Sequence, residues 1–481
     1  MAKLSNLIKD APNIQIDTLM ESSKEKCLNG MFFALPGLVH DGHDFIDQAI
    51  ENGAVCIVYS KEVTAMKAEI VYIQVEDTFQ ALKQVATIFY DNPAEKLQTI
   101  GVTGTNGKSS VAYLIKSILN NFEICGYIGT ISIEYGEIRI EPKFTTPTVV
   151  ELLSHLKDMV NHCCKSVTIE ATSQGLHQGR LDVIDFDAAI FTNLTYDHLD
   201  YHRNMENYFL AKKRLFDNLS EEGLAIINVD DEYGRKLLET TSNKIITYGI
   251  SNEATYHGKN IQLFKDKTEF TLSCFDQEYQ IETKLVSRFN VYNVLAAIAY
   301  THQAGHNLKD IIDALGKINQ IDGRMQKINE KINFDVIVDY AHTPDGYVKF
   351  FDFVKSVTRP DKRIISVFGA PGKRDKDKRS MLAQIADEHS DLIVLTEEDP
   401  RDENPVEIAK EIQQSLHSSK SIIVIDRYDA INQAMMLANE GDTVCILGKG
   451  FEKFLDRETG REYWMGDDEA VKEVINENFS E

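Results

Sequence analysis

A glycine-rich loop carries the clearest chemical signal in this sequence. Residues 101–110 read GVTGTNGKSS, after the strand-like run QTIGV and before the helix-like run VAYLIKSILN. Such a loop can hold phosphates with its backbone N–H groups and the positive helix end, while Lys108 adds a charge and Ser109 can reach Mg²⁺. The generic spacing would need glycine where Val102 stands, and the alternative is a plain glycine-rich turn. We predict a site for a nucleoside triphosphate on Gly104, Thr105, Asn106, Gly107, Lys108, Ser109 and Ser110.

Three further segments place polar side chains after apolar, strand-like sequence or on a helix. Glu170 lies in TIEATSQGLHQGR, His198 lies in FTNLTYDHLDYH, and Lys212 lies in the helix-like MENYFLAKKRLF. Each has a plainer interpretation when taken singly: a solvated strand end, a helix cap and a surface lysine. Their chemical meaning therefore depends on their occurring together with the phosphate loop.

Together these segments resemble the Mur ligase family, and most closely its UDP-N-acetylmuramoyl-tripeptide synthetases, the MurE type. The resemblance covers nearly the whole chain, and the ordered motifs are far more specific together than any one of them. The motifs are DGHDF, GTNGKS, TTP, ExxSxGLxxxR, NLTxDHLDYH, AKxxLF, NxDD, FNVYN, GRM, DYAHTPD, GKRDKDKR, DPR and GKGxE.

The resemblance implies an acid–amino-acid ligase that forms ADP. In this chemistry ATP phosphorylates a carboxylate of a UDP-linked peptide, and an amine then attacks the acyl phosphate to form an amide. Both steps gather negative charge, so cations must face the phosphoryl and tetrahedral oxygens. The family analogy gives catalytic roles to Lys108, Glu170, His198 and Lys212. It also implies Mg²⁺ held by Ser109, Glu170, His198 and Lys212, the lysine being carbamylated by CO₂.

The same resemblance implies the contacts to the two nucleotides. It places Asn293, Arg324, Asp339 and His342 at ATP, the last three coming from the hinge and the third domain. For the UDP-N-acetylmuramoyl-dipeptide it implies Ser22, Thr145, Thr146, Ser173 and Arg180. The match departs from the family pattern in three places. Glu21-Ser22-Ser23 replaces Asp-Ser-Arg, Gln174 replaces a histidine, and Ser287 replaces a glycine.

The incoming amino acid is the least determined part of the prediction. The family pattern implies a pocket formed by Arg374, Asp399, Arg401, Gly448 and Glu452. Arg401 stands where diaminopimelate-adding enzymes carry an arginine for the distal carboxylate, but Asp399 replaces the usual asparagine and suits an ammonium. An arginine–carboxylate bond contributes roughly 1.5–3 kcal/mol, more than about 1 kcal/mol for one hydrated carboxylate. We therefore favour meso-diaminopimelate, with L-lysine as the alternative.

These residues need three α/β units to position them. Strand-like runs alternate with helix-like runs throughout, and the last third contains short apolar strands that end in polar residues. This pattern is typical of a parallel sheet covered on both faces, with function at the carboxyl ends of its strands. We predict an N-terminal UDP-binding domain at 1–97, a central P-loop-type ATPase domain with a mostly parallel sheet at 98–323, and a Rossmann-like domain at 324–481.

Composition narrows the class of protein. The 481 residues carry a formal net charge of −24, which disfavours binding to nucleic acid or to an anionic membrane. Seven scattered cysteines without a CxxC pair predict neither a disulfide framework nor a zinc site. No signal-like or membrane-spanning run is evident, so we expect a cytoplasmic enzyme, acting as a monomer. The remaining alternatives are a folylpolyglutamate synthetase-like ligase, which lacks a UDP-binding first domain, and a non-catalytic Mur-fold binding protein.

Overall fold

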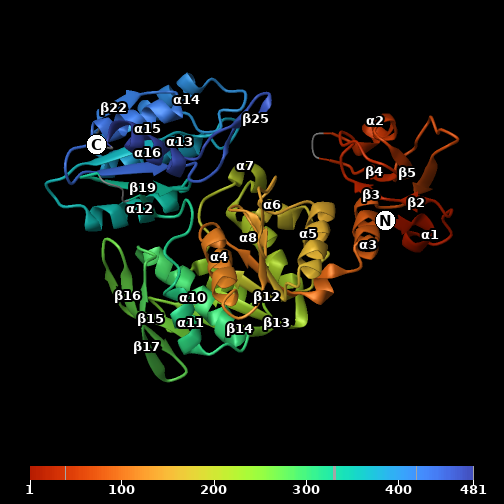
Figure 1. Ribbon diagram of the computed structural model, residues 1–481, viewed down its shortest axis with the longest axis horizontal. Coiled ribbons are helices and arrows are strands. Elements are labelled where there is room, and N and C mark those ends of the chain that lie inside the picture. Colours follow the sequence, from red (N-terminus) through yellow and green to blue (C-terminus); the bar gives the residue numbers. More distant parts are fainter. Residues whose placement is uncertain (38–39, 329–331, 419, 480–481) are drawn as a thin grey trace.

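Three sheets divide the protein, as the computed structural model shows (Figure 1). The structure describes residues 1–37, 40–328, 332–418 and 420–479. A four-stranded sheet lies near the N-terminus, an eleven-stranded sheet occupies the middle of the chain, and a six-stranded sheet lies towards the C-terminus. The predicted α/β class with mostly parallel sheets is confirmed. We propose division at residues 97 and 323, because these positions fall between the strands of successive sheets.

The N-terminal sheet has the order β3-β4-β5-β6, and all its neighbouring strands are parallel. Helix α3 begins where the Asp77 carboxylate accepts hydrogen bonds from the N–H groups of Phe79 and Gln80, and its apolar face covers the sheet. The elements are β1 (Ala2–Lys3), α1 (Leu4–Leu7), β2 (Gln15–Ile16), β3 (Thr18–Met20), β4 (Gly30–Phe33), α2 (Ile46–Glu51), β5 (Ala54–Tyr59), β6 (Val71–Gln74) and α3 (Thr78–Phe89).

The central sheet has the order β10-β9-β8-β11-β7-β12-β13-β14-β15-β16-β17, parallel from β8 to β15. The strands are β7 (Gln98–Thr103), β8 (Cys125–Ile128), β9 (Ile133–Tyr135), β10 (Ile138–Ile140), β11 (Ser166–Glu170), β12 (Phe186–Phe191), β13 (Leu219–Asn228), β14 (Lys244–Gly249), β15 (Tyr256–Leu263), β16 (Thr268–Cys274) and β17 (Gln277–Thr283). The helices are α4 (Lys108–Leu119), α5 (Val149–Asn161), α6 (Ser173–His177), α7 (Leu199–His202), α8 (Met205–Asp217), α9 (Glu232–Leu238), α10 (Arg288–Gln303) and α11 (Leu308–Leu315). Antiparallel β16 and β17 extend the sheet beyond its parallel part, an extension that apolar runs alone did not predict.

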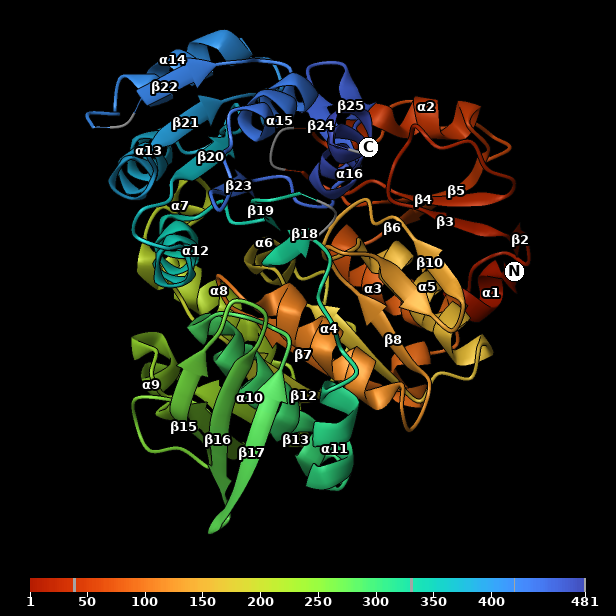
Figure 2. The same ribbon diagram turned by 60° about the vertical axis from the view of Figure 1, so that its left-hand side comes forward.

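The C-terminal sheet has the order β18-β19-β23-β20-β21-β22 and is parallel except for β18. Figure 2 shows this unit above the central one. A small hairpin, β24 (Phe454–Arg457) with β25 (Gly460–Tyr463), stands apart from the main sheet. The other elements are β18 (Gln326–Ile328), β19 (Asp335–Asp339), α12 (Pro344–Val357), β20 (Ile364–Phe368), α13 (Asp377–His389), β21 (Leu392–Leu395), α14 (Pro405–Gln413), β22 (Lys420–Ile423), α15 (Arg427–Met436), β23 (Thr443–Leu447) and α16 (Asp467–Asn478).

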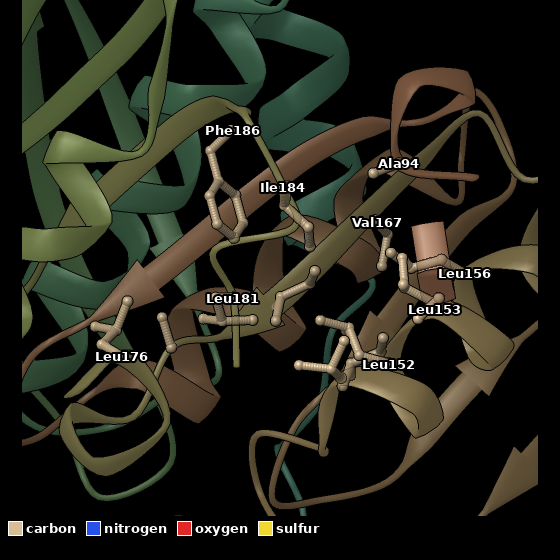
Figure 3. Packing of buried hydrophobic residues seen from close by; sticks show 14 of the residues in the cluster. Ala94, Leu152, Leu153, Leu156, Val167, Leu176, Leu181, Ile184 and Phe186 are labelled. Atoms are coloured by element: carbon tan, nitrogen blue, oxygen red, sulfur yellow. The ribbon is translucent and has the colours of Figure 1, made fainter. Parts of the chain in front are cut away.

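One continuous core joins the first two units and holds the central sheet in place. Helix α5 buries Leu152, Leu153 and Leu156 at helical spacing, and these side chains pack near Val167 of β11 and near Ala94, which precedes β7 (Figure 3). Strand β11 is buried along its whole length, so Glu170 at its carboxyl end is carried into the interior. Across the part of the chain that the structure describes, no helix is both long and apolar enough to cross a membrane.

Candidate functional site

The phosphate loop connects β7 to α4, as its sequence predicts. Gly104 and Gly107 have φ angles of +144° and +87°, values that side chains other than glycine rarely adopt. A Cβ atom at Gly104 would also lie 1.8 Å from Thr192 Oγ1, and one at Gly107 would lie 2.6 Å from Asn293 Oδ1. Both glycines are therefore required by backbone angle and by space. Lys108 folds back over the loop and donates to the carbonyl oxygens of Gly104 and Thr105 at 3.1 and 2.8 Å.

Glu170 lies directly beside this loop. Its carboxylate accepts hydrogen bonds from Ser109 Oγ at 2.9 Å, Tyr127 Oη at 2.6 Å and the Thr130 N–H at 2.8 Å. Mg²⁺ prefers oxygen ligands and is commonly held by one or two carboxylates together with substrate phosphates. The Glu170 carboxylate and the Ser109 hydroxyl, both adjoining the phosphate loop, therefore fit a magnesium ion.

Lys212 lies beneath the same loop on α8. Its side chain is 1% exposed, and Nζ donates to the Gly104 carbonyl oxygen at 2.6 Å and lies 4.6 Å from the Tyr208 ring centroid. Burial, and then the neighbouring Lys108 cation, hold the pKa of Lys212 well below its ordinary value. A lowered pKa favours the neutral amine, which is the form of a lysine that reacts with CO₂. Among the described residues, no group of three His, Cys, Asp or Glu side chains lies close enough together to hold a metal ion.

A single cavity of about 730 Å³ connects the phosphate loop to the C-terminal unit. Gly104, which belongs to the loop, and Lys212, which contacts it, do not line the cavity, and neither does Ser22. Of the predicted site residues, the cavity is lined by Thr105, Asn106, Gly107, Lys108, Ser109, Ser110, Thr145, Thr146, Glu170, Ser173, Arg180, His198, Asn293, Arg324, Asp339, His342, Arg374, Asp399, Arg401, Gly448 and Glu452.

Residues from the hinge and the C-terminal unit reach the phosphate loop directly. Arg324 donates to Ser109 Oγ at 2.9 Å, and its guanidinium stacks 4.6 Å from the Tyr340 ring centroid. Asp339 fixes this turn by accepting hydrogen bonds from the N–H groups of Met325 and Ala341, both at 2.7 Å. Arg324 therefore lies at the loop, and Asp339 holds the turn beside Arg324 and lines the same cavity.

The predicted sugar-peptide residues form one connected wall of the cavity. Thr146 donates to the Glu170 carbonyl oxygen at 2.6 Å, and Arg180 donates to the Thr146 carbonyl oxygen at 2.8 Å. At the N-terminal unit, where the family pattern has arginine, Ser23 is buried and donates to Gln48 at 2.7 Å. The structure therefore supplies no cation at that position, and the contact of Ser22 with uracil stays a prediction.

The opposite end of the cavity is rich in acidic and basic groups. Lys449 is 1% exposed and forms ion pairs with Asp399 at 2.9 Å and with Glu452. Arg401 donates to the Gly372 carbonyl oxygen at 2.6 Å and to Asp456 Oδ2 at 3.3 Å. This end can recognise a molecule that carries both ammonium and carboxylate groups.

Glu398 is the buried carboxyl at this end, where it is 7% exposed. Burial raises the pKa of Glu398 to about 8 from 4.5, although Arg427 opposes the shift. At neutral pH this carboxyl is therefore protonated in the folded protein and ionised in the unfolded chain. Its contribution to stability is complete below pH 4.5 and is lost as pH rises through about 8.

Replacing Glu398 with glutamine is expected to flatten this pH dependence. The free energy of unfolding of Glu398→Gln should exceed that of the parent by an amount that grows between pH 4.5 and 8. This difference should reach the order of a few kcal/mol. Urea unfolding at several pH values measures it, with the exposed Glu407→Gln as control. If the difference in unfolding free energy between Glu398→Gln and the parent stayed constant from pH 4.5 to 8, the raised pKa of Glu398 would be contradicted.

Several site residues were not among the sequence-based candidates, and three of them show why. The Thr130 N–H binds the Glu170 carboxylate, Lys378 forms an ion pair with buried Asp197 at 3.0 Å, and Lys449 neutralises two pocket carboxylates. The lysines lie inside the GKRDKDKR and GKGxE motifs, and those motifs could have nominated them. Thr130 carries no comparable signal because its backbone provides the contact.

Comparisons with known proteins agree with this geometry. The family profiles described as Mur ligase middle domain, Mur ligase glutamate ligase domain and Mur ligase family catalytic domain match residues 102–301, 323–450 and 28–90. A Clostridium acetobutylicum protein named UDP-N-acetylmuramoyl-L-alanyl-D-glutamate--2,6-diaminopimelate ligase 1 is 38% identical over 473 residues, covering 97% of this chain and 96% of the relative. The chain belongs to the Mur ligase family. The predicted resemblance is thereby confirmed.

Two further relatives of this Mur ligase carry a similar name. A Halalkalibacterium halodurans protein named UDP-N-acetylmuramoyl-L-alanyl-D-glutamate--2,6-diaminopimelate ligase is 36% identical, covering 96% of this chain and 95% of the relative. A solved structure of a UDP-N-acetylmuramoyl-L-alanyl-D-glutamate--2,6-diaminopimelate ligase is 27% identical, with a TM-score of 0.67 and full coverage of both chains. Like its relatives in this family, the protein is an ATP-dependent ligase.

Proposed function

We propose that this Mur ligase adds meso-diaminopimelate to UDP-N-acetylmuramoyl-L-alanyl-D-glutamate, in an ATP-dependent step of peptidoglycan precursor synthesis. The observation that carries the proposal is one cavity with a phosphate loop at one end and Arg401 among ion-paired carboxylates at the other. Relatives at 36–38% identity over nearly the full length carry the name of this reaction. L-lysine in place of diaminopimelate is the alternative.

The reaction that we propose has two balanced steps. A carboxylate oxygen of the UDP-linked dipeptide bonds to the γ-phosphorus of ATP and ADP leaves. The neutral amine of the diamino acid then forms a bond to the acyl carbon, the bond to phosphate breaks, and the nitrogen loses one proton to the departing phosphate or to water as the amide forms. Lys108 and the loop N–H groups bind the ATP phosphates. The positively charged guanidinium of Arg324 lies beside them, next to Ser109.

Mg²⁺ would be held by Glu170, Ser109, His198 and modified Lys212, and when bound it would neutralise phosphate charge. The remaining roles belong to the chain itself. Asn293 at the loop, together with Asp339 and His342 from the C-terminal unit, orients the nucleotide. These contacts cross between domains, so closure can exclude water from the acyl phosphate.

Lys212 is proposed to carry the carbamate. The neutral nitrogen would bond to the carbon of CO₂ and release one proton, which converts an amine into a group with two carboxylate-like oxygens. The buried, pKa-lowered nitrogen beside the phosphate loop supports this chemistry. An unmodified lysine would be a poor neighbour for a magnesium ion because it offers no negatively charged oxygen.

The substrate binding that we propose runs along the cavity. Ser22, Thr145, Thr146, Ser173 and Arg180 would bind the UDP-N-acetylmuramoyl-dipeptide. A free diamino acid would occupy the pocket formed by Arg374, Asp399, Arg401, Gly448 and Glu452. We also propose that the enzyme works as a monomer in the cytoplasm, without nucleic acid or membrane as a partner.

Two other functions fit less well. A folylpolyglutamate synthetase-like ligase would share the core but not a UDP-binding first domain, whereas the family profile and the relatives extend into the N-terminal unit. A non-catalytic Mur-fold binding protein would not need Lys108, Glu170, His198 and Lys212 around one loop.

Release of ADP from ATP and Mg²⁺ tests the proposal. The expected result is ADP formation that requires both the UDP-linked dipeptide and a diamino acid, with higher kcat/KM for meso-diaminopimelate than for L-lysine. Comparable ADP release without any amino acid would indicate a plain ATPase. A strong preference for L-lysine would overturn the choice of amino acid and leave the reaction class standing.

A further inference from the structure

The β24–β25 hairpin is tied to the loop that carries Asp399 and Arg401. The Arg401 N–H donates to the Asp456 carbonyl oxygen, and the Asp456 N–H donates to Asp399 Oδ1, both at 2.9 Å. Arg457 adds a two-pronged ion pair with Glu397. The hairpin and the pocket loop are therefore joined by hydrogen bonds. Because both of these bonds involve the Asp456 backbone, they hold Asp456 next to Arg401.

This arrangement places the Asp456 carboxylate against the guanidinium of Arg401. Asp456 Oδ2 lies 3.3 Å from Arg401 Nη2, and the two side chains are 31% and 25% exposed. The other terminal nitrogen of Arg401 already donates to the Gly372 carbonyl oxygen at 2.6 Å. A ligand carboxylate that approaches Arg401 therefore meets an arginine that already has a negatively charged partner.

We propose that Asp456 is a specificity-determining residue, which competes with the distal carboxylate of the incoming diamino acid for Arg401. This inference rests on the proposed function. Asp456 weakens the binding of diaminopimelate, whose distal carboxylate needs the arginine. It leaves L-lysine nearly unaffected, because lysine has no carboxylate at that end.

The hairpin offers Asp456 a second cation, which makes the exchange feasible. Arg461 Nε lies 3.7 Å from Asp456 Oδ1, and the Arg461 guanidinium is held by stacking on Phe454 and by the Lys143 carbonyl oxygen. When a ligand carboxylate takes the Arg401 nitrogen, the Asp456 charge remains paired. The Asp456 carboxylate thus lowers the affinity for diaminopimelate without preventing its binding.

Replacing Asp456 with asparagine tests the inference. Asparagine preserves size and an acceptor oxygen but removes the charge, so the KM for meso-diaminopimelate should fall about fivefold, the effect of one partly exposed ion pair. The kcat should not change, and the KM for L-lysine should stay within about twofold. Glu462→Gln, on the same hairpin but bonded to Arg457, is the matched control and should change neither KM.

A background without the arginine sharpens the test. In Arg401→Ala, adding Asp456→Asn should no longer improve the KM for diaminopimelate, because the contested cation is gone. If Asp456→Asn alone raised the KM for meso-diaminopimelate, or changed the KM equally for both amino acids, the inference would be overturned. Asp456 would then be a structural residue. Failure of the parent enzyme to form ADP with either amino acid would instead refute the proposed function.

Discussion

Replacing Lys212 with alanine is expected to lower the rate of ligation roughly a thousandfold or more. Metal-ion stabilisation of a transition state is typically worth several kcal/mol, and each 1.36 kcal/mol changes a rate about tenfold. The alanine variant loses the nitrogen that would carry the carbamate, and the site loses a negatively charged ligand. Added short carboxylic acids should restore part of the activity by supplying oxygens to the vacated space.

Two measurements separate this role from a structural one. Lys213→Ala changes the next residue on α8, which pairs with Asp217 at the surface, and should retain nearly full activity. Carbon-13 NMR with labelled bicarbonate should show a carbamate signal in the parent enzyme and in Lys213→Ala but not in Lys212→Ala. Full ligation by Lys212→Ala without additives would refute the proposal.

Replacing Arg427 with methionine is expected to destabilise the C-terminal unit by about 3–5 kcal/mol. Arg427 and Asp467 are fully buried and form a two-pronged ion pair at 2.7 Å for both bonds. Arg427 also donates to the carbonyl oxygens of Glu397 and Leu447. Methionine would leave the Asp467 carboxylate buried without its cation, which is the costly state.

Urea unfolding followed by Trp464 fluorescence measures this effect, because Trp464 is buried in the same unit. The control is Arg359→Met, whose ion pair with Asp361 at 3.7 Å is mostly exposed and should change stability by less than about 1 kcal/mol. Replacing both partners, as Arg427→Met with Asp467→Leu, should recover part of the loss, since no unpaired charge remains. Equal effects of Arg427→Met and Arg359→Met would contradict the argument.

Much of the site was predictable because motifs are local. The phosphate loop needs glycine at 104 and 107, a lysine and a hydroxyl within a few residues, and these requirements appear directly in the sequence. Glu170 could be assigned to the end of a strand from its apolar run, and a buried parallel strand carries its last residue to the edge where ligands bind. Its role at the site came only from the family resemblance. The antiparallel extension of β16 and β17 and the hairpin of β24 and β25 were not anticipated, because pairing partners depend on tertiary context.

The amino-acid sequence alone determined the fold class, the phosphate loop and the family, since backbone angles, apolar periodicity and ordered motifs are written in neighbouring residues. Only the tertiary structure decided which charges meet. It paired Lys449 with Asp399 and Glu452, buried Lys212 beneath Gly104, and set Asp456 against Arg401. The physical reason is that electrostatic energy depends on distance and burial, which residues far apart in the chain acquire only when it folds.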